Sequence, residues 1–422
     1  MEQDSRSMAT PLLESLPSRT GSKLLTMGNI IVSVVGTGVL ALPFAFRIAG
    51  WLAGSLGVAI AGLTTYYCML LLVLCREKLA SDGSLAEAKT YGDLGYRILG
   101  NPGRYLTETL VLLSQCGGAV AYMLFIGQNL QSVFQGNGFT FTSYVFLLVP
   151  IEIGLSWIGR LSALAPYSIF ADVCNVLAMG IVVKEDIGQA VTGRASFEQR
   201  TAITPDIKKL PFAGGMAVFC FEGFAMTLAL ESSMQDRAKF PRLLALAFCG
   251  ITFLYVLFGF CGYMAYGDET RDIVTLNLPG TWTSCTVKAG LCLGLVFTFP
   301  IMVHPVNEIV EGKLESFKWF RKYLHADDND STGLGKFGTY TSRAILVAGL
   351  AVMALCVPAF GVFASLVGST VSALISFVLP ATFHLKLFGS SLHVWQKALD
   401  FILVFVGSVF AVYGTYSTIV GI

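Results

Sequence analysis

The sequence is poor in charged residues. Asp, Glu, Lys and Arg make up 13% of its 422 residues, against about 25% in soluble domains, and 54% of the residues are hydrophobic. The mean hydropathy of +0.68 is that of a chain that passes through a membrane several times. The net charge of +1 and the lack of a basic tract give no basis for nucleic-acid binding.

Motifs of catalysis and metal binding are also missing. The sequence contains no HExxH, no GxSxG and no CxxC. Most of the ten cysteines lie inside apolar runs, where a thiol acts as a small hydrophobic side chain. We therefore expect no enzyme, no metal site and no cofactor.

Residues 1–22 are polar and contain Pro11 and Pro17, so they lack the early apolar core of a cleavable signal peptide. We predict a disordered cytosolic tail over 1–22 and a membrane domain over 23–422. A spanning helix needs about 20 apolar residues. Eleven runs of this kind can be counted, at approximately 23–46, 51–75, 105–134, 142–158, 163–190, 210–231, 241–265, 283–309, 340–357, 360–384 and 395–420.

These runs predict an all-α polytopic membrane protein with 11 transmembrane helices. If the chain crosses the membrane at each run, most lysines and arginines fall on the side of the N-terminus. The positive-inside rule then places the N-terminus in the cytosol and the C-terminus on the lumenal or exterior side.

The first run, KLLTMGNIIVSVVGTGVLALPFAF, is interrupted near its middle by Gly36, Thr37 and Gly38. Glycine destabilises a helix interior by about 1 kcal/mol relative to alanine. Unwound backbone at membrane depth is tolerated where it lines a cavity or is buried in protein. We therefore predict a broken first span with a binding site at Val35, Gly36, Thr37, Gly38 and Val39.

The sixth run, PFAGGMAVFCFEGFAMTLALESSM, has Glu222 next to Gly223 at its middle. An ionised carboxylate at this depth costs at least about 2.5 kcal/mol, which makes it a functional candidate. Two broken spans, five spans apart, are typical of transporters built from inverted repeats. The second half of the predicted site is formed by Phe219, Cys220, Phe221, Glu222 and Gly223.

Such a pair of breaks suits a zwitterion. Amides at the first break face a carboxylate at the positive end of a helix, and carbonyls at Cys220–Glu222 face an ammonium group. The rings of Phe219, Phe221, Phe224 and Tyr122 leave room for a small apolar side chain. For each ring singly, packing in the core or against lipid is the alternative.

Four motifs together resemble the amino acid/auxin permease family. They are GNIIVSVVGTGVLALPFAF, TYGDLGYRILG, FCFEGFAMTLALESSM and FPIMVHPVNEIVEG. Within that family the sequence is most similar to plant vacuolar amino acid exporters and proton-assisted amino acid transporters. The resemblance covers about Gly21 to the C-terminus. It implies eleven spans with a five-plus-five inverted repeat, as in amino acid-polyamine-organocation transporters, and proton-linked movement of neutral amino acids by alternating access.

The implied repeats are residues 23–190 and 210–384, with an extra span at 395–420. The animal proton-assisted members have a functional histidine near the start of the membrane domain, whereas the four histidines here all come late, beginning with His304. The acids in the spans are therefore the candidates for proton coupling, with Glu222 first and Asp172 also among them. A permanently neutral acid that holds the break open is the alternative for Glu222, and packing with Asn175 is the alternative for Asp172. Glu231 is expected to pair with a loop cation such as Arg237.

Sodium is the alternative coupling ion. Oxygen ligands for it are offered by Asn29, Ser33, Thr298 and Asn307, although isolated polar residues in spans mostly make interhelical hydrogen bonds. The leading hypothesis is a proton-coupled exporter of neutral amino acids, such as alanine or proline, from an acidic vacuole to the cytosol. The alternatives are an amino acid-binding membrane sensor with little flux and a sodium-coupled or plasma-membrane importer.

Overall fold

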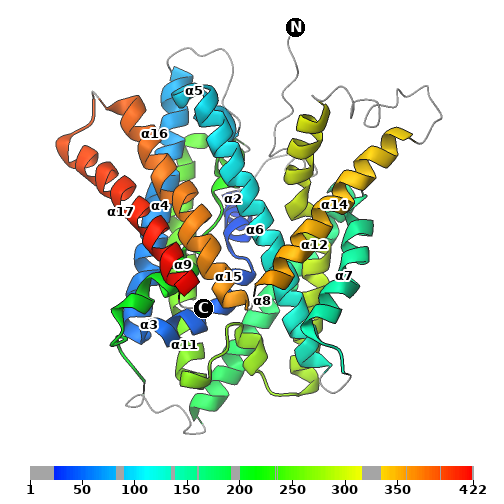
Figure 1. Cartoon of the computed structure of the whole chain (residues 1–422). Helices are drawn as coiled ribbons and strands as arrows, with labels where there is room; N and C mark the ends of the chain where they lie inside the picture. The colour runs from blue at the N-terminus through cyan, green and yellow to red at the C-terminus, as the bar shows by residue number, and fades with distance from the viewer. Residues whose placement is uncertain are drawn as a thin grey trace. The chain divides into compact units, whose positions relative to one another are not determined.

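The computed structural model describes residues 23–81, 90–134, 138–158, 161–191, 200–232, 234, 236–315, 334–357, 359–389 and 391–420. The predicted tail at 1–22 lies outside these residues. Every regular element in the described ranges is a helix, as composition predicted (Figure 1). The elements are α2 (Lys23–Val34), η1 (Thr37–Ala41), α3 (Leu42–Ala49), α4 (Trp51–Ser81), α5 (Tyr91–Leu99), α6 (Asn101–Val133), α7 (Phe141–Ser156), α8 (Leu161–Val191), η3 (Ile207–Lys209), α9 (Leu210–Cys220), α10 (Phe224–Ser232), η4 (Arg237–Lys239), α11 (Phe240–Tyr266), η5 (Gly267–Glu269), η6 (Val274–Asn277), α12 (Trp282–Glu315), α14 (Leu334–Cys356), α15 (Phe360–Val367), η7 (Gly368–Ser372), η8 (Leu374–Val378), α16 (Leu379–Phe388) and α17 (Val394–Val420).

Within the described ranges, 8 helical segments are long and apolar enough to cross a membrane. The pair formed by α2 and η1–α3 makes a ninth if it counts as one span. The two other predicted runs fall on α7, which has 16 residues, and on α8, which has 31. All eleven predicted runs therefore lie on helices, while the number of membrane crossings stays a prediction.

The chain divides into two compact units. The first contains residues 1–114, 175–279 and 359–422, and the second contains residues 115–174 and 280–358. Each unit contains helices from both predicted repeats. This does not argue against the repeats, because a repeat relates two stretches of sequence and does not have to form a compact unit. The division therefore leaves the repeats at 23–190 and 210–384 as predictions.

In the first unit, α9 packs closely against the tenth helical segment, which consists of α15, η7, η8 and α16. A Cβ atom on Gly215 of α9 would lie 2.5 Å from the carbonyl oxygen of Ser365, and one on Gly368 would overlap the carbonyl oxygen of Gly215. The Ser365 hydroxyl, in turn, donates to the carbonyl of Phe212 at 2.9 Å. Small residues let helices pack backbone to backbone in lipid, where hydrophobic burial contributes little to association.

The tenth helical segment widens into π-helix over η7 and η8. Its serines Ser369, Ser372 and Ser376 are buried. The hydroxyl of Tyr91 in α5 donates to the carbonyl of Ile375 at 2.9 Å, which satisfies a main-chain acceptor within the widened turns. Burial raises the pKa of the Tyr91 phenol well above its ordinary value, so the hydroxyl remains a donor at physiological pH.

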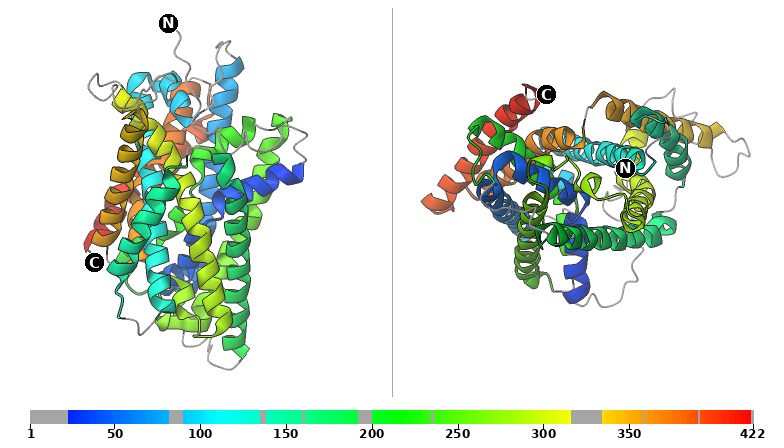
Figure 2. Two further views of the ribbon diagram at one scale, coloured as in Figure 1. Left: turned by 90° about the vertical axis from the view of Figure 1, so that its right-hand side faces the viewer. Right: turned by 90° about the horizontal axis from the view of Figure 1, so that it is seen from below.

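The C-terminal helix α17, red in Figure 2, packs on α9, α15, the π-helical turns and α16. Its opposite face carries exposed apolar side chains, including Phe405, Val412 and Ile419. In a membrane protein such a face is suited to lipid, because lipid tails are as apolar as these side chains.

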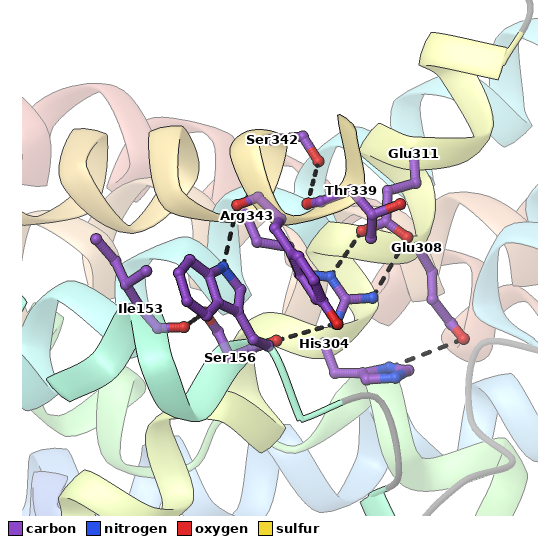
Figure 3. A network of polar contacts seen from close by, with 10 residues as sticks. Ile153, Ser156, His304, Glu308, Glu311, Thr339, Ser342 and Arg343 are labelled. Carbon is purple, nitrogen blue, oxygen red and sulfur yellow. Dashed lines mark hydrogen bonds and ion pairs between the residues drawn. The ribbon is translucent and has the colours of Figure 1, made fainter. Parts of the chain in front are cut away.

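The second unit is organised around α7, α12 and α14, which pack together (Figure 1). Arg343 of α14 donates from Nε to Glu311 Oε1 of α12 at 2.8 Å and from Nη1 to the Ser156 carbonyl at 2.9 Å (Figure 3). The indole of Trp157 donates to the carbonyl of Tyr340 at 3.1 Å. Arg343 thus satisfies a carbonyl at the end of α7, where the helix itself provides no donor.

Candidate functional site

The first span is broken where the glycines predict it. Helix α2 ends at Val34, Gly36 is extended (φ −111°, ψ −169°), and a new helix begins at Thr37 and continues through α3. The two halves are bent by 48°. The first amides of the second half have no intrahelical acceptor and lie at the positive end of a helix, so they can bind an anionic group.

The sixth predicted span, formed by α9 and α10, is interrupted at Glu222, where the sequence predicts a break. Helix α9 ends at Cys220 and α10 begins at Phe224. The amides of Phe221 and Glu222 donate to the carbonyls of Val218 and Phe219, at 3.1 and 3.3 Å, which closes the last turn of α9. The carbonyls of Phe221 and Glu222 themselves lie between the two helices, outside both hydrogen-bond ladders, and can accept from a ligand.

The two breaks face each other within the first unit. A Cβ atom on Gly38 would lie 3.3 Å from Cys220 Sγ and 3.3 Å from a ring carbon of Phe219. A Cβ atom on Gly223 would lie 3.1 Å from a methyl carbon of Val34. The two breaks are therefore in contact, and the absence of a side chain at Gly38 permits the close approach.

Tyr255 of α11 joins the two breaks. Its hydroxyl oxygen lies 3.2 Å from the carbonyl oxygen of Val34 and 3.2 Å from that of Cys220, the last residues of α2 and α9. The side chain is 1% exposed. Tyr255 was not predicted from the sequence, because it is 221 positions from Val34 and 35 positions from Cys220, and no sequence pattern relates residues at those separations.

We expect Tyr255→Phe to weaken substrate binding about tenfold, since loss of the one buried hydrogen bond that this hydroxyl donates costs about 1–3 kcal/mol. The measurement is the apparent affinity in transport assays. Tyr263→Phe is the matched control, because it removes a buried hydroxyl of the same helix that accepts from the amide of Thr201 at 3.2 Å. Equal loss of affinity in both variants would contradict a specific role for Tyr255.

The carboxyl group of Glu222 lies close to the hydroxyls of Ser114 and Ser372. Its Oε2 atom and Ser372 Oγ are both buried and lack a hydrogen-bond partner of good geometry among the described residues. Ser372 belongs to the π-helical turn η7. A carboxyl among hydroxyls can gain or lose a proton without breaking an ion pair, which is what a proton-coupling group requires.

Other predicted site residues lie in different surroundings. The ring of Phe221 packs on α11, with its centroid 5.0 Å from that of Tyr255 and 6.2 Å from that of Phe248, so its side chain belongs to the core. Tyr122 belongs to the second unit. Asp172 lies in α8, and its side chain is outside the described part of the structure. The roles of Tyr122 and Asp172 therefore stay predictions.

Glu231 has a partner that the sequence did not reveal. It forms an ion pair with Arg76 of α4, and the two side chains are 0% and 4% exposed. Arg76 Nη1 also donates to the carbonyl of Leu228 at 3.4 Å. The expected partner was the loop cation Arg237, because Arg76 lies 155 residues from Glu231 along the chain. The pair fixes the second half of the broken segment to α4.

Two of the proposed sodium ligands donate to their own helices. The hydroxyls of Ser33 and Thr298 each donate, at 2.8 Å, to a carbonyl about one turn earlier, those of Ile30 and Gly294. Such hydrogen bonds are the ordinary role of isolated hydroxyls in spans. They leave the choice between sodium and protons to experiment.

Several known proteins are similar to this chain over nearly its whole length. The family model described as "Transmembrane amino acid transporter protein" matches residues 19–420. The amino acid transporter ANT1 of Arabidopsis thaliana is 61% identical over 417 residues, 98% of this chain and 96% of the relative. The amino acid transporter AVT3C of Arabidopsis thaliana is 37% identical over 439 residues, 97% of this chain and 93% of the relative.

Two solved structures share the fold. MhsT in complex with L-phenylalanine matches with a TM-score of 0.51 and 14% identity, covering 94% of this chain and 98% of that one. The inward-facing conformation of Mhp1 matches with a TM-score of 0.52 and 11% identity, covering 95% of this chain and 89% of that one. At these identities the likeness concerns the fold alone.

Proposed function

Because the chain belongs to the transmembrane amino acid transporter family, we propose that it carries neutral amino acids across its membrane by alternating access, coupled to protons. The proposed direction is from an acidic vacuole into the cytosol, through eleven spans with an inverted repeat. The N-terminus then lies in the cytosol and the C-terminus in the lumen.

The observation that supports this proposal is the pair of opened helices in contact at Gly38 and Cys220. One break offers the amides at the start of a helix and the other offers the carbonyls of Phe221 and Glu222. These groups match the carboxylate and the ammonium of an amino acid. Since both ends are held by main chain, the site suits substrates such as alanine or proline, whose side chains carry no charge.

A proton gradient provides enough energy for the proposed export. Each unit of pH difference is worth about 1.4 kcal/mol, so one coupled proton sustains about a tenfold substrate gradient per unit. Glu222, beside the hydroxyls of Ser114 and Ser372, is the group that we assign to proton coupling.

Uptake by proteoliposomes tests the function. The purified full chain is reconstituted, and a panel of labelled amino acids is offered under an imposed proton gradient, an imposed sodium gradient or neither. We expect accumulation of alanine or proline that follows the proton gradient. Saturable binding without transfer of label would instead indicate a sensor, and accumulation that follows only sodium would identify the other coupling ion.

We expect Glu222→Gln to abolish accumulation driven by a pH gradient, because the amide keeps the size of the side chain but cannot carry a proton. Counterflow at equal pH on both sides should continue at a comparable rate, since exchange needs no net proton movement. An unchanged dependence of uptake on pH would remove Glu222 from the coupling mechanism.

A further inference from the structure

A buried cluster of titratable side chains lies where α4, α16 and α17 meet, on elements that do not form the breaks. His384 Nδ1 of α16 lies 2.6 Å from Asp400 Oδ2 of α17. The Tyr67 hydroxyl of α4 donates to Asp400 Oδ1 at 3.4 Å. The side chain of Asp400 is fully buried and that of His384 is 5% exposed.

This cluster was not predicted from the sequence, because its members are far apart along the chain. The two residues are 16 positions apart and lie on consecutive helices that pack together. Tyr67 is 333 positions from Asp400. Only the packing of α4 and α16 on α17 assembles the three.

The contacts permit two states that differ by one proton. A nitrogen and an oxygen atom 2.6 Å apart share a hydrogen, so a neutral imidazole donates from Nδ1 to the Asp400 carboxylate, and the net charge is −1. A second proton on Nε2 creates an imidazolium that faces the carboxylate, and the net charge is zero. The first state leaves one uncompensated charge in a buried cluster, whereas the second leaves none, so the two states differ in electrostatic energy.

The titratable groups around the pair of His384 and Asp400 come from several elements. On α4, Tyr67, Cys68 and Cys75 are close enough to Asp400 to interact with its charge, and tyrosine and cysteine side chains are mainly neutral between pH 5 and 7. From α5, Tyr91 stacks edge-on against Phe383, next to His384, with centroids 6.0 Å apart.

The remaining neighbours contribute little charge. Segments α15, η7 and η8, which pack on α17, have no titratable residue, and α9 has only Cys220. On the helices of the cluster itself, Lys386 is exposed and Lys397 is half-buried.

We propose that His384, Asp400 and Tyr67 form a second proton-binding site of the transporter, distinct from Glu222. The proposal rests on the proton coupling in the proposed function. Helix α16, which carries His384, continues directly from the π-helical turns that place Ser372 beside Glu222. A change of charge at His384 therefore acts on the same segment that contacts the first site.

The cluster also lies near one end of its helices. His384 is one turn before the end of α16 at Phe388, about 6 Å, and Asp400 is six residues after the start of α17, about 9 Å. These helix ends are the ones that the distribution of lysine and arginine places at the cytosol. We therefore assign proton exchange with the cytosol to this site.

The test uses the full chain in proteoliposomes with His384→Gln and Asp400→Asn. Each variant keeps a hydrogen-bonding side chain of similar size but removes the proton-binding group. His393→Gln is the matched control, because His393 is an exposed histidine in the turn between the same two helices. Two rates are measured for each protein, namely accumulation under a gradient of two pH units and counterflow at equal pH.

We expect accumulation to fall at least tenfold in His384→Gln and Asp400→Asn, while counterflow stays within about twofold of the unsubstituted protein. One pH unit corresponds to a tenfold gradient per proton, so loss of coupling at this site removes at least that factor. His393→Gln should behave as the unsubstituted protein. Tyr67→Phe should retain accumulation but shift its pH dependence.

Two results would overturn the second site. Accumulation in His384→Gln equal to that in His393→Gln would show that the cluster carries no coupled proton. Equal losses of accumulation and counterflow would show that it only supports the fold. If the unsubstituted protein itself ignores the pH gradient, the proton coupling of the proposed function fails first, and that result is visible before any variant is made.

Discussion

Gly36→Leu will abolish amino acid uptake while leaving the protein folded. An ideal Cβ atom at Gly36 meets no heavy atom within 4 Å, and the extended backbone at this residue (φ −111°, ψ −169°) accommodates any L-amino acid. The leucine side chain would occupy the space before the amides that we assign to the substrate carboxylate. Because a displacement of about 1 Å can lower a rate 10²-fold, we expect kcat/KM for uptake to fall at least about 100-fold.

The control for this prediction is Gly57→Leu. Gly57 lies on the exposed face of α4, and a Cβ atom there also meets nothing within 4 Å. Both variants should keep their Tm within about 2 °C of the unsubstituted protein, as substitutions into open space do, and only Gly36→Leu should lose uptake. Gly36→Ala should lie between the two. Normal uptake by Gly36→Leu would separate the first break from substrate binding.

Removing one partner of the Arg76 and Glu231 pair will destabilise the protein by about 3–5 kcal/mol, because the other charge is left buried and unbalanced. Glu231 also lies at the C-terminal end of α10, where the helix dipole disfavours a negative charge. Arg76 offsets that cost and satisfies the carbonyl of Leu228. The measurement is unfolding by heat or denaturant in a lipid or detergent environment that is kept constant.

Two comparisons sharpen this prediction. The double variant Arg76→Met with Glu231→Leu leaves no buried charge, so it should recover most of the stability lost by either single variant. Glu108→Gln removes one partner of the partly exposed pair with Arg104, in which the Glu108 and Arg104 side chains are 19% and 43% exposed, and should cost at most about 1 kcal/mol. A Glu231→Leu protein as stable as Glu108→Gln would refute the structural role of the buried pair.

The helical breaks could be predicted from sequence because their causes are local. Glycines around Thr37, and a carboxylate beside Gly223, each disfavour a continuous helix in lipid without reference to any other part of the chain. The apolar runs likewise place every predicted span on a helix. Local sequence did not predict the π-helical turns η7 and η8, because nothing in the residues of 368–378 distinguishes them from those of an ordinary α-helix in lipid.

The partners of the site residues could not be predicted, because each depends on packing between distant segments. Arg76 meets Glu231, and Tyr255 meets Val34, only after α4 and α11 have packed on the broken helices. The surroundings of the aromatic rings could not be predicted for the same reason. Phe219 and Phe221 have similar sequence contexts, yet Phe219 contacts the first break and Phe221 packs into α11.

Tyr255 has a consequence for movement at the breaks. A phenol carries one hydrogen, so at any moment it donates to either Val34 or Cys220, although both oxygens are in reach. If the two half-helices separate during transport, the phenol remains bonded to one of them, and the number of hydrogen bonds that it donates does not change. The hydrogen bond can therefore pass from one helix to the other at little enthalpic cost. Tyr255 would then allow the two helix ends to move apart rather than hold them together.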